Sequence, residues 1–365
     1  MAVSALYPWL GKLFPTRDRP ARAPRRIVLI RPCCIGDVVM ATAALQALQA
    51  HYPKARITWA VGGWSKEVAA LWQPEIDLLD TGAAANPAAN LGGFVRLVRG
   101  LRGGGYDLAV VLSRSPLMSL AVALSGIPWR AGLDSAGRGF GYNLRVPIDP
   151  ATRHHEVDIY LSVAEALGAK TAGIVPRVPV AKKTRVPAVA APYLVVNPSG
   201  GHNPGGRMDA KRYPAHWLAQ IVNTIAPGLG IEQVVVVAGP GDKLLAMQVQ
   251  ANLHRTLRTQ TFVGTLSFAQ IAKFAANARL YIGNDTGLTH LAAAAGGRVA
   301  MLLGPTDPAR YRAYAPDAIT LWREVAVSAG GFVGGVPPGW AWDANGIAPD
   351  EAAGQILAAL GGADN

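Results

Sequence analysis

The sequence predicts an α/β protein built from two Rossmann-like, doubly wound domains. Short, uninterrupted apolar runs alternate with helical stretches along most of the chain, a pattern typical of parallel strands covered by helices on both faces. With 365 residues, the chain is also too long for one ordinary core and fits two α/β domains. Two such domains would face a central ligand cleft at the carboxyl ends of their strands.

The first domain is expected at residues 26–170. Strands are predicted at 27–30, 57–61 and 108–112, where apolar and β-branched residues follow one another without a break. A helix is predicted over 38–50, because its sequence carries an apolar face. These elements alternate as a parallel sheet requires.

Residues 171–192 are expected to connect the domains, because they are rich in proline, carry a basic cluster and lack helical periodicity. The strand-and-helix pattern then restarts in a second domain, placed at 193–346. Its strands are predicted at 193–196, 234–237, 279–283 and 299–303. Residues 347–365 are interpreted as a closing helix and tail.

The first 25 residues form an apolar and basic leader. Aromatic and apolar residues at 6–14 precede five arginines between positions 17 and 26. Such a segment suits peripheral contact of residues 6–26 with an anionic membrane, whereas its four prolines favour a disordered basic leader. Both interpretations stay open. The net charge of +12 indicates anionic partners, but no basic-aromatic stripe accompanies it, so nucleic acid is not expected.

We expect a cytoplasmic protein, and peripheral association with the inner face of the cytoplasmic membrane stays open. The sequence contains no apolar run of the roughly twenty residues that a spanning helix needs. Its N-terminus lacks the order of a secretory signal, in which basic residues precede an apolar core. The two cysteines, Cys33 and Cys34, are adjacent and cannot form a long-range disulfide framework.

The stretch from Gly283 to His290 (Gly-Asn-Asp-Thr-Gly-Leu-Thr-His) carries the strongest functional signal. It follows a predicted strand and leads into a small-residue helix, the local geometry that holds a phosphate on backbone N–H groups. Asp285 and His290 flank that anion site with a carboxylate and an imidazole. A sugar nucleotide offers a diphosphate and a ring of hydroxyls, which these groups could bind.

Other candidates also follow predicted strands directly. Asp37 comes after the first strand, either as a helix-capping residue or as a general base for an acceptor hydroxyl. Ser199 and Gly200 lie in a glycine-containing loop that could approach a phosphate. Lys211 could supply positive charge to a diphosphate, and Asp242 is either a helix cap or a ribose contact. Parallel sheets bind ligands at this carboxyl edge.

The sequence lacks the signatures of several cofactor and metal sites. No strand is followed by the dinucleotide fingerprint, and there is neither a Walker-type phosphate loop nor an Asp-x-Asp pair. His154, His155 and Glu156 are a weak metal candidate, since adjacent side chains on a helix point apart. We therefore expect a metal-independent transfer that uses no cofactor.

Together these segments resemble the heptosyltransferase family of glycosyltransferases, family 9, whose members share the two-domain GT-B fold. The matching pieces run in the family's order from about Arg26 to Pro308. They are Gly36-Asp37-Val38, Asn197-Pro198-Ser199-Gly200, Lys211-Arg212-Tyr213-Pro214-Ala215-His216-Trp217, Asn284 to His290, and Gly304-Pro305-Thr306-Asp307-Pro308.

The resemblance implies an inverting transfer of a heptose, or a similar sugar, from an ADP-heptose-type donor to a saccharide or glycolipid acceptor of the lipopolysaccharide core. It implies that Asp37 is the base and that Asp285 binds the hydroxyls of the donor sugar. It also implies a ribose contact at Asp242 and backbone contact with adenine at Leu266. The diphosphate contacts that it implies are Lys211, Thr286, Gly287 and His290, beside the loop of Ser199 and Gly200.

The chain departs from the family pattern at two places. Pro32-Cys33-Cys34-Ile35 stands where relatives often carry small hydroxyl residues before Gly-Asp, and the loop between Ser199 and Lys211 is longer than usual. Two alternatives remain: a nucleotide-sugar epimerase or hydrolase of the same fold, and a non-catalytic nucleotide-sugar-binding protein. A transferase is favoured over the non-catalytic binding protein by the joint presence of Asp37, Lys211, Asp285 and His290.

Overall fold

A computed structural model of the chain describes residues 7–84, 86–149, 153–203, 206–325 and 336–361. The chain folds into two compact units, Met1–Pro176 and Arg177–Asn365. Each unit contains one six-stranded parallel sheet. The predicted α/β class with two Rossmann-like sheets is therefore confirmed.

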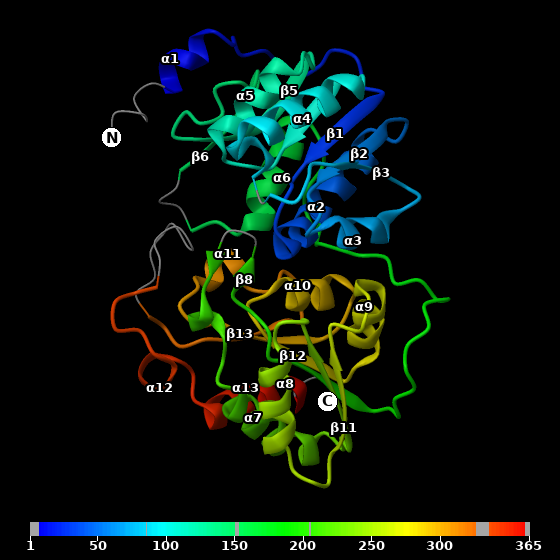
Figure 1. The fold of residues 1–365 in the computed structure, drawn as a ribbon, viewed down its shortest axis with the longest axis vertical. Coiled ribbons are helices and arrows are strands. Elements are labelled where there is room, and N and C mark those ends of the chain that lie inside the picture. Colours follow the sequence, from blue (N-terminus) through cyan, green and yellow to red (C-terminus); the bar gives the residue numbers. More distant parts are fainter. Residues whose placement is uncertain (1–6, 85, 150–152, 204–205, 326–335, 362–365) are drawn as a thin grey trace. The chain divides into compact units, whose positions relative to one another are not determined.

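The sheet of the first unit has the order β3-β2-β1-β4-β5-β6, with its helices around it in Figure 1. The chain adds strands outward from β1 in one direction as far as β3 and then in the other direction from β4 to β6, which makes the unit doubly wound. Its strands are β1 (Arg26–Ile30), β2 (Arg56–Val61), β3 (Asp77–Asp80), β4 (Leu108–Val111), β5 (Trp129–Ser135) and β6 (Leu144–Ile148). Its helices are α1 (Tyr7–Lys12), α2 (Ile35–His51), α3 (Lys66–Ala69), η1 (Ala70–Trp72), η2 (Pro87–Ala89), α4 (Leu91–Gly103), α5 (Pro116–Leu124) and α6 (Glu156–Ala166).

Burial explains why β1 lies inside this sheet. Its last four residues are fully buried, and Leu29 pairs with Trp59 of β2 on one side and Val110 of β4 on the other. A strand with helices on both faces must be apolar on both faces. Leu97 of α4 and Met118 of α5 pack on one face, and α2 and α6 pack against each other.

The sheet of the second unit has the order β11-β10-β7-β12-β13-β14. Its strands are β7 (Tyr193–Asn197), β10 (Gln233–Ala238), β11 (Arg258–Val263), β12 (Leu280–Asn284), β13 (Val299–Leu302) and β14 (Ile319–Leu321). Its helices are η3 (Asp209–Lys211), α7 (Ala215–Gly228), α8 (Lys243–Asn252), α9 (Phe268–Asn277), α10 (Gly287–Ala294), α11 (Pro308–Tyr311), α12 (Trp342–Asn345) and α13 (Pro349–Gly361).

Residues of the second core follow the same logic. Val196 of β7 and Val236 of β10 share a buried cluster with Ile221 of α7 and Ile356 of α13. Burying such side chains contributes about 1.5–3 kcal/mol each. The long loop noted between Ser199 and Lys211 contains a small antiparallel pair, β8 (His202–Asn203) and β9 (Gly206–Arg207).

The leader contains a helix that packs on the first unit. Tyr7 and Phe14, at the two ends of this segment, lie 6.0 and 6.3 Å from the ring of Phe140. Arg145 donates hydrogen bonds to the carbonyl oxygens of Gly11 and Phe14. No helix in the described part of the chain is long and apolar enough to cross a membrane.

Candidate active site

Asn284 joins three of the predicted site loops. It is the last residue of β12 and is fully buried. Its Nδ2 donates to the carbonyl oxygens of Pro198 (2.9 Å) and Ser199 (3.0 Å), and its Oδ1 accepts from the N–H of Tyr213 (3.0 Å). The loops after β7, after η3 and after β12 are thereby held together at the carboxyl edge of the sheet.

The loop after β7 lies against the segment after β12. Ser199 donates its N–H to Asn197 Oδ1 (2.8 Å) and accepts at Oγ from the N–H of Gly239 (3.0 Å). A Cβ on Gly200 would lie 2.9 Å from Cγ2 of Thr286. Only glycine therefore permits this close approach.

Thr286 begins α10. Its Oγ1 accepts from the N–H of Leu288 at 3.2 Å, which makes it the N-cap, and Gly287 is the first residue of the helix. N–H groups of a first helical turn have no intrahelical partner, and the helix dipole favours an anion beside them. The predicted sequence of strand, turn and helix start is confirmed.

Lys211, Asp285 and His290 form a buried cluster at this helix start, with exposed fractions of 7%, 6% and 5%. The Lys211 ammonium forms an ion pair with Asp285 Oδ2, and Nε2 of His290 lies 3.7 Å from Asp285 Oδ1. Burial alone would raise the pKa of Asp285, but Lys211 and His290 outweigh it and hold that pKa below its usual range. Asp285 is therefore ionised at neutral pH.

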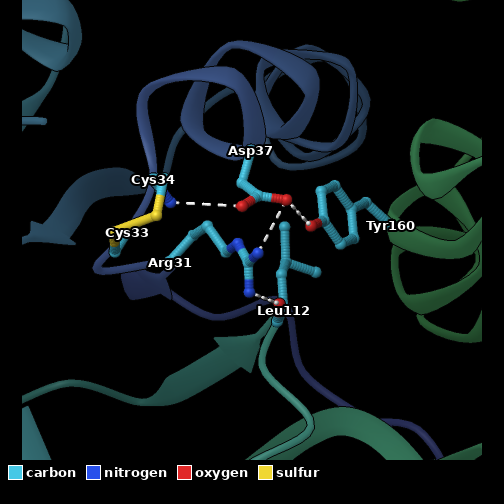
Figure 2. The surroundings of a disulfide bond; sticks show 6 residues. All are labelled: Arg31, Cys33, Cys34, Asp37, Leu112 and Tyr160. Carbon is cyan, nitrogen blue, oxygen red and sulfur yellow. Dashed lines mark hydrogen bonds and ion pairs between the residues drawn. A yellow bond between two sulfur atoms is a disulfide. The ribbon is translucent and has the colours of Figure 1, made fainter. Parts of the chain in front are cut away.

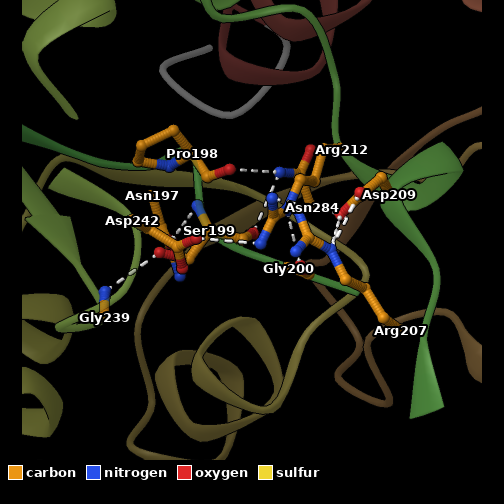
Figure 3. A network of polar contacts seen from close by, with 10 residues as sticks. All are labelled: Asn197, Pro198, Ser199, Gly200, Arg207, Asp209, Arg212, Gly239, Asp242 and Asn284. Atoms are coloured by element: carbon orange, nitrogen blue, oxygen red, sulfur yellow. Dashed lines mark hydrogen bonds and ion pairs between the residues drawn. The ribbon is translucent and has the colours of Figure 1, made fainter. Parts of the chain in front are cut away.

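Asp242 follows β10 and precedes α8, yet its side chain makes no capping hydrogen bond. Instead its Oδ1 pairs with Nη2 of Arg212 at 2.8 Å (Figure 3). Arg212 also donates to the carbonyl oxygen of Gly200 (2.8 Å) and pairs with Asp209 (3.1 Å). Sequence reasoning named Arg212 only within a motif and missed this bridge. Leu266 lies half-buried between β11 and α9.

Asp37 belongs to the first unit and is the third residue of α2. Its Oδ1 accepts from Nη2 of Arg31 (2.7 Å) and from the hydroxyl of Tyr160 (2.9 Å), while Oδ2 accepts from the N–H of Cys34 (3.2 Å) (Figure 2). The bond to Cys34 caps the helix from the third position, so Asp37 is not the N-cap residue itself. A disulfide joins Cys33 and Cys34, a local pairing that sequence reasoning did not consider.

The pKa of Asp37 is lowered despite its partial burial. Desolvation raises that pKa, but the Arg31 guanidinium and the hydrogen bonds from Cys34 and Tyr160 outweigh it. The carboxylate is therefore ionised at neutral pH and accepts protons only weakly. Neither Arg31 nor Tyr160 was predicted from the sequence as part of the site.

The weak metal candidate near residue 155 has other contacts. The Nδ1 atom of His155 accepts from the N–H of Val157 at 3.1 Å and caps α6. Glu156 pairs with Arg114, whose Nη2 lies 2.9 Å from both carboxylate oxygens. Among the described residues, no group of three or more His, Cys, Asp or Glu side chains is arranged to hold a metal ion.

Residues 94–329 match the family model of glycosyltransferase family 9 (heptosyltransferase). The chain belongs to this family. It is 27% identical over 296 residues to lipopolysaccharide heptosyltransferase 2 of Escherichia coli K12, covering 78% of this chain and 84% of that protein. It is 25% identical over 322 residues to lipooligosaccharide heptosyltransferase 2 of Haemophilus influenzae, covering 81% and 88%.

Solved family 9 structures share the fold of this glycosyltransferase. A family 9 glycosyl transferase from Veillonella parvula has a TM-score of 0.77 at 19% identity, covering 94% of this chain and 99% of that one. E. coli ADP-heptose lps heptosyltransferase II has a TM-score of 0.69 at 21% identity, covering 93% and 100%. The predicted family and the predicted class of enzyme are both confirmed.

Proposed function

We propose that this glycosyltransferase moves a heptose from an ADP-heptose-type donor to a saccharide or glycolipid acceptor of the lipopolysaccharide core, with inversion and without a metal ion. The buried cluster of Lys211, Asp285 and His290 at the start of α10 carries the proposal. Relatives named lipopolysaccharide heptosyltransferase support the sugar and the acceptor class. A family 9 structure described with ADP-2-deoxy-2-fluoro heptose supports the nucleotide.

The second unit would bind the donor. The N–H groups of Thr286 and Gly287 would face the diphosphate, with Ser199 and Gly200 on the adjoining loop. An ammonium has three donors, so Lys211 can keep its ion pair with Asp285 and still contact a phosphate oxygen. Asp285 would accept from the sugar hydroxyls, Asp242 from the ribose, and the backbone at Leu266 would contact adenine.

Asp37 would act as the general base. It takes the proton of the acceptor hydroxyl, whose oxygen electron pair forms the new bond to the anomeric carbon. The bond from that carbon to the diphosphate oxygen breaks, and the diphosphate leaves with its electron pair. Positive charge from Lys211, a hydrogen bond from His290 and the α10 amides would stabilise the leaving group.

We also propose that the enzyme works at the cytoplasmic face of an anionic membrane and contacts it through residues 6–26. Trp9 and Leu13 are 66% and 70% exposed although the helix that carries Trp9 packs on the first unit. Lys12 and the leader arginines Arg17, Arg19, Arg22, Arg25 and Arg26 are exposed as well. Exposed apolar side chains beside cations favour an anionic lipid surface.

A donor panel tests the proposed function directly. The protein is treated with excess EDTA and its thermal unfolding is followed with ADP-, UDP- and GDP-linked sugars. A ligand that binds only the native state raises its stability by mass action, so ADP-heptose should raise the Tm most and should support transfer to a core acceptor in EDTA. A preference for another nucleotide would overturn the ADP-linked donor. A strict requirement for Mg²⁺ would overturn the metal-independent mechanism.

A further inference from the structure

The two oxygens of the Asp37 carboxylate are used unequally. Oδ1 accepts two hydrogen bonds, from Arg31 and Tyr160, whereas Oδ2 accepts one, from the N–H of Cys34 (Figure 2). Each oxygen of an ionised carboxylate has about two lone-pair positions. Counting the contacts of the described residues, Oδ1 is therefore filled and Oδ2 retains one open position. The side chain of Asp37 is 23% exposed, so it is not sealed inside the first unit.

The two partners of Oδ1 are themselves fixed. Tyr160 is fully buried on α6, which packs against α2. Arg31 directly follows β1, donates through Nη1 to the carbonyl oxygen of Leu112 (3.1 Å), and lies 5.4 Å from the centre of the Tyr160 ring. Both donors are therefore held in place by the surrounding structure and point at the same oxygen. Their positions fix the orientation of the Asp37 carboxylate.

We propose that Arg31 and Tyr160 are positioning residues that fill Oδ1 of Asp37 and leave Oδ2 to take the acceptor proton. This inference rests on the proposed function, in which Asp37 is the base. The acceptor O–H bond breaks, its proton goes to Oδ2, and its electron pair forms the bond to the anomeric carbon as the diphosphate departs. Arg31 and Tyr160 keep their own protons throughout the step.

The charges around Asp37 support this division of roles. Arg31 and Asp37 form one ion pair, and Arg114 and Glu156 form a second on the neighbouring elements. Burial raises the pKa of the Tyr160 hydroxyl well above its usual value, so this group remains a donor. Protonating Asp37 would remove the carboxylate that pairs directly with Arg31, so the ionised base is the stable resting form.

The variant Tyr160→Phe tests the inference, because it removes one donor and keeps the ring. We expect kcat to fall roughly 10- to 100-fold, as for one hydrogen bond to a charged group, with the donor KM within about twofold of wild type. The loss of a bond to the ionised form raises the pKa of Asp37, so the acid limb of the kcat–pH profile should move to higher pH. Arg31→Met should move the acid limb still further, and Arg31→Lys should bring it part of the way back to its wild-type position.

Tyr52→Phe is the matched control. Tyr52 is the C-cap residue that follows α2, and its hydroxyl donates to the carbonyl oxygen of Leu167, the C-cap residue that follows α6 (3.4 Å). The same substitution at the other end of the same helix pair should leave kcat and the pH profile unchanged. A Tyr160→Phe enzyme with a wild-type pH profile, beside an Asp37→Asn enzyme whose kcat has fallen at least 10²-fold, would overturn the positioning role alone. Transfer by Asp37→Asn at a rate close to that of wild type would overturn the base and the positioning role together.

Discussion

The Lys211 ammonium and the Asp285 carboxylate form a buried ion pair at the start of α10. Removing one partner of a buried ion pair lowers the free energy of unfolding, because it leaves the other charge buried without compensation. The pair lies beside the helix amides that we assign to the diphosphate. One contact therefore bears on both the stability of the second unit and the binding of the donor.

Lys211→Met should weaken donor binding and slow transfer, because it removes positive charge from the leaving group. It should also lower the free energy of unfolding by about 3–5 kcal/mol, since Asp285 stays buried. Denaturant unfolding and donor titration below the unfolding transition separate the two effects. Lys243→Met, at an exposed lysine in the same unit, is the control. Wild-type donor affinity in Lys211→Met would refute the diphosphate role.

Asp37→Asn should lower kcat by roughly 10²–10⁴-fold, the usual contribution of a general base. Donor affinity should change little, because the proposed donor contacts belong to the second unit. Single-turnover kinetics and donor titration measure the two quantities. Asp77→Asn, which removes another carboxylate paired with an arginine in the first unit, controls for the lost ion pair. If donor hydrolysis survived in Asp37→Asn, a hydrolase would be the better assignment.

Stability should fall in acid as Asp285 is protonated. Its pKa is lower in the folded chain than the unfolded value of about 3.9, so the stabilisation is complete above that value and is lost as the pH falls through the folded pKa. Asp285→Asn should be less stable than wild type at pH 7, and the difference should shrink below about pH 4. Denaturant midpoints between pH 3 and pH 7 measure it. A difference independent of pH would argue against this linkage.

Vesicle binding tests the membrane contact. Wild-type protein should sediment with vesicles that contain anionic lipid, and binding should weaken as salt screens the charges. The double variant Trp9→Ser/Leu13→Ser should bind less, because two exposed apolar side chains are lost. Leu244→Ser changes an equally exposed leucine in the second unit and should have no effect. Equal sedimentation of all three proteins would exclude this surface.

Most inner strands were predictable from the sequence, whereas the edge strands were not. The inner strand β5 was also missed, because its sequence mixes charged and small residues with apolar ones. β1, β7 and β10 are buried along nearly their whole length and appear as unbroken apolar runs. The edge strands β3 and β11 are only partly buried and mix charged or polar residues with apolar ones. An edge strand has a neighbour on one side only and therefore needs less apolar sequence. Hydrophobic patterning therefore marks the central strands of a sheet more clearly than its edges.

The candidate site was predictable where its residues are neighbours along the chain. Asp285, Thr286 and Gly287 stand together after a strand, and their structural context follows from that order. Tyr160 lies 123 positions from Asp37, and Arg212 lies 30 from Asp242. A buried tyrosine on an apolar helix face, or an arginine in a loop, has no local sequence signal for such a contact. Only the fold brings these pairs together.

The hydrogen bonds of Asn284 bear on any attempt to redesign this enzyme. One amide spans segments that begin near Pro198, Tyr213 and Asp285, and an aspartate there would lose both donated bonds and place a charge in the interior. Loop grafting from a relative, as a route to a new nucleotide specificity, should therefore exchange these three segments as one block. A single transplanted loop would lack the hydrogen bonds to its neighbouring segments that hold its conformation.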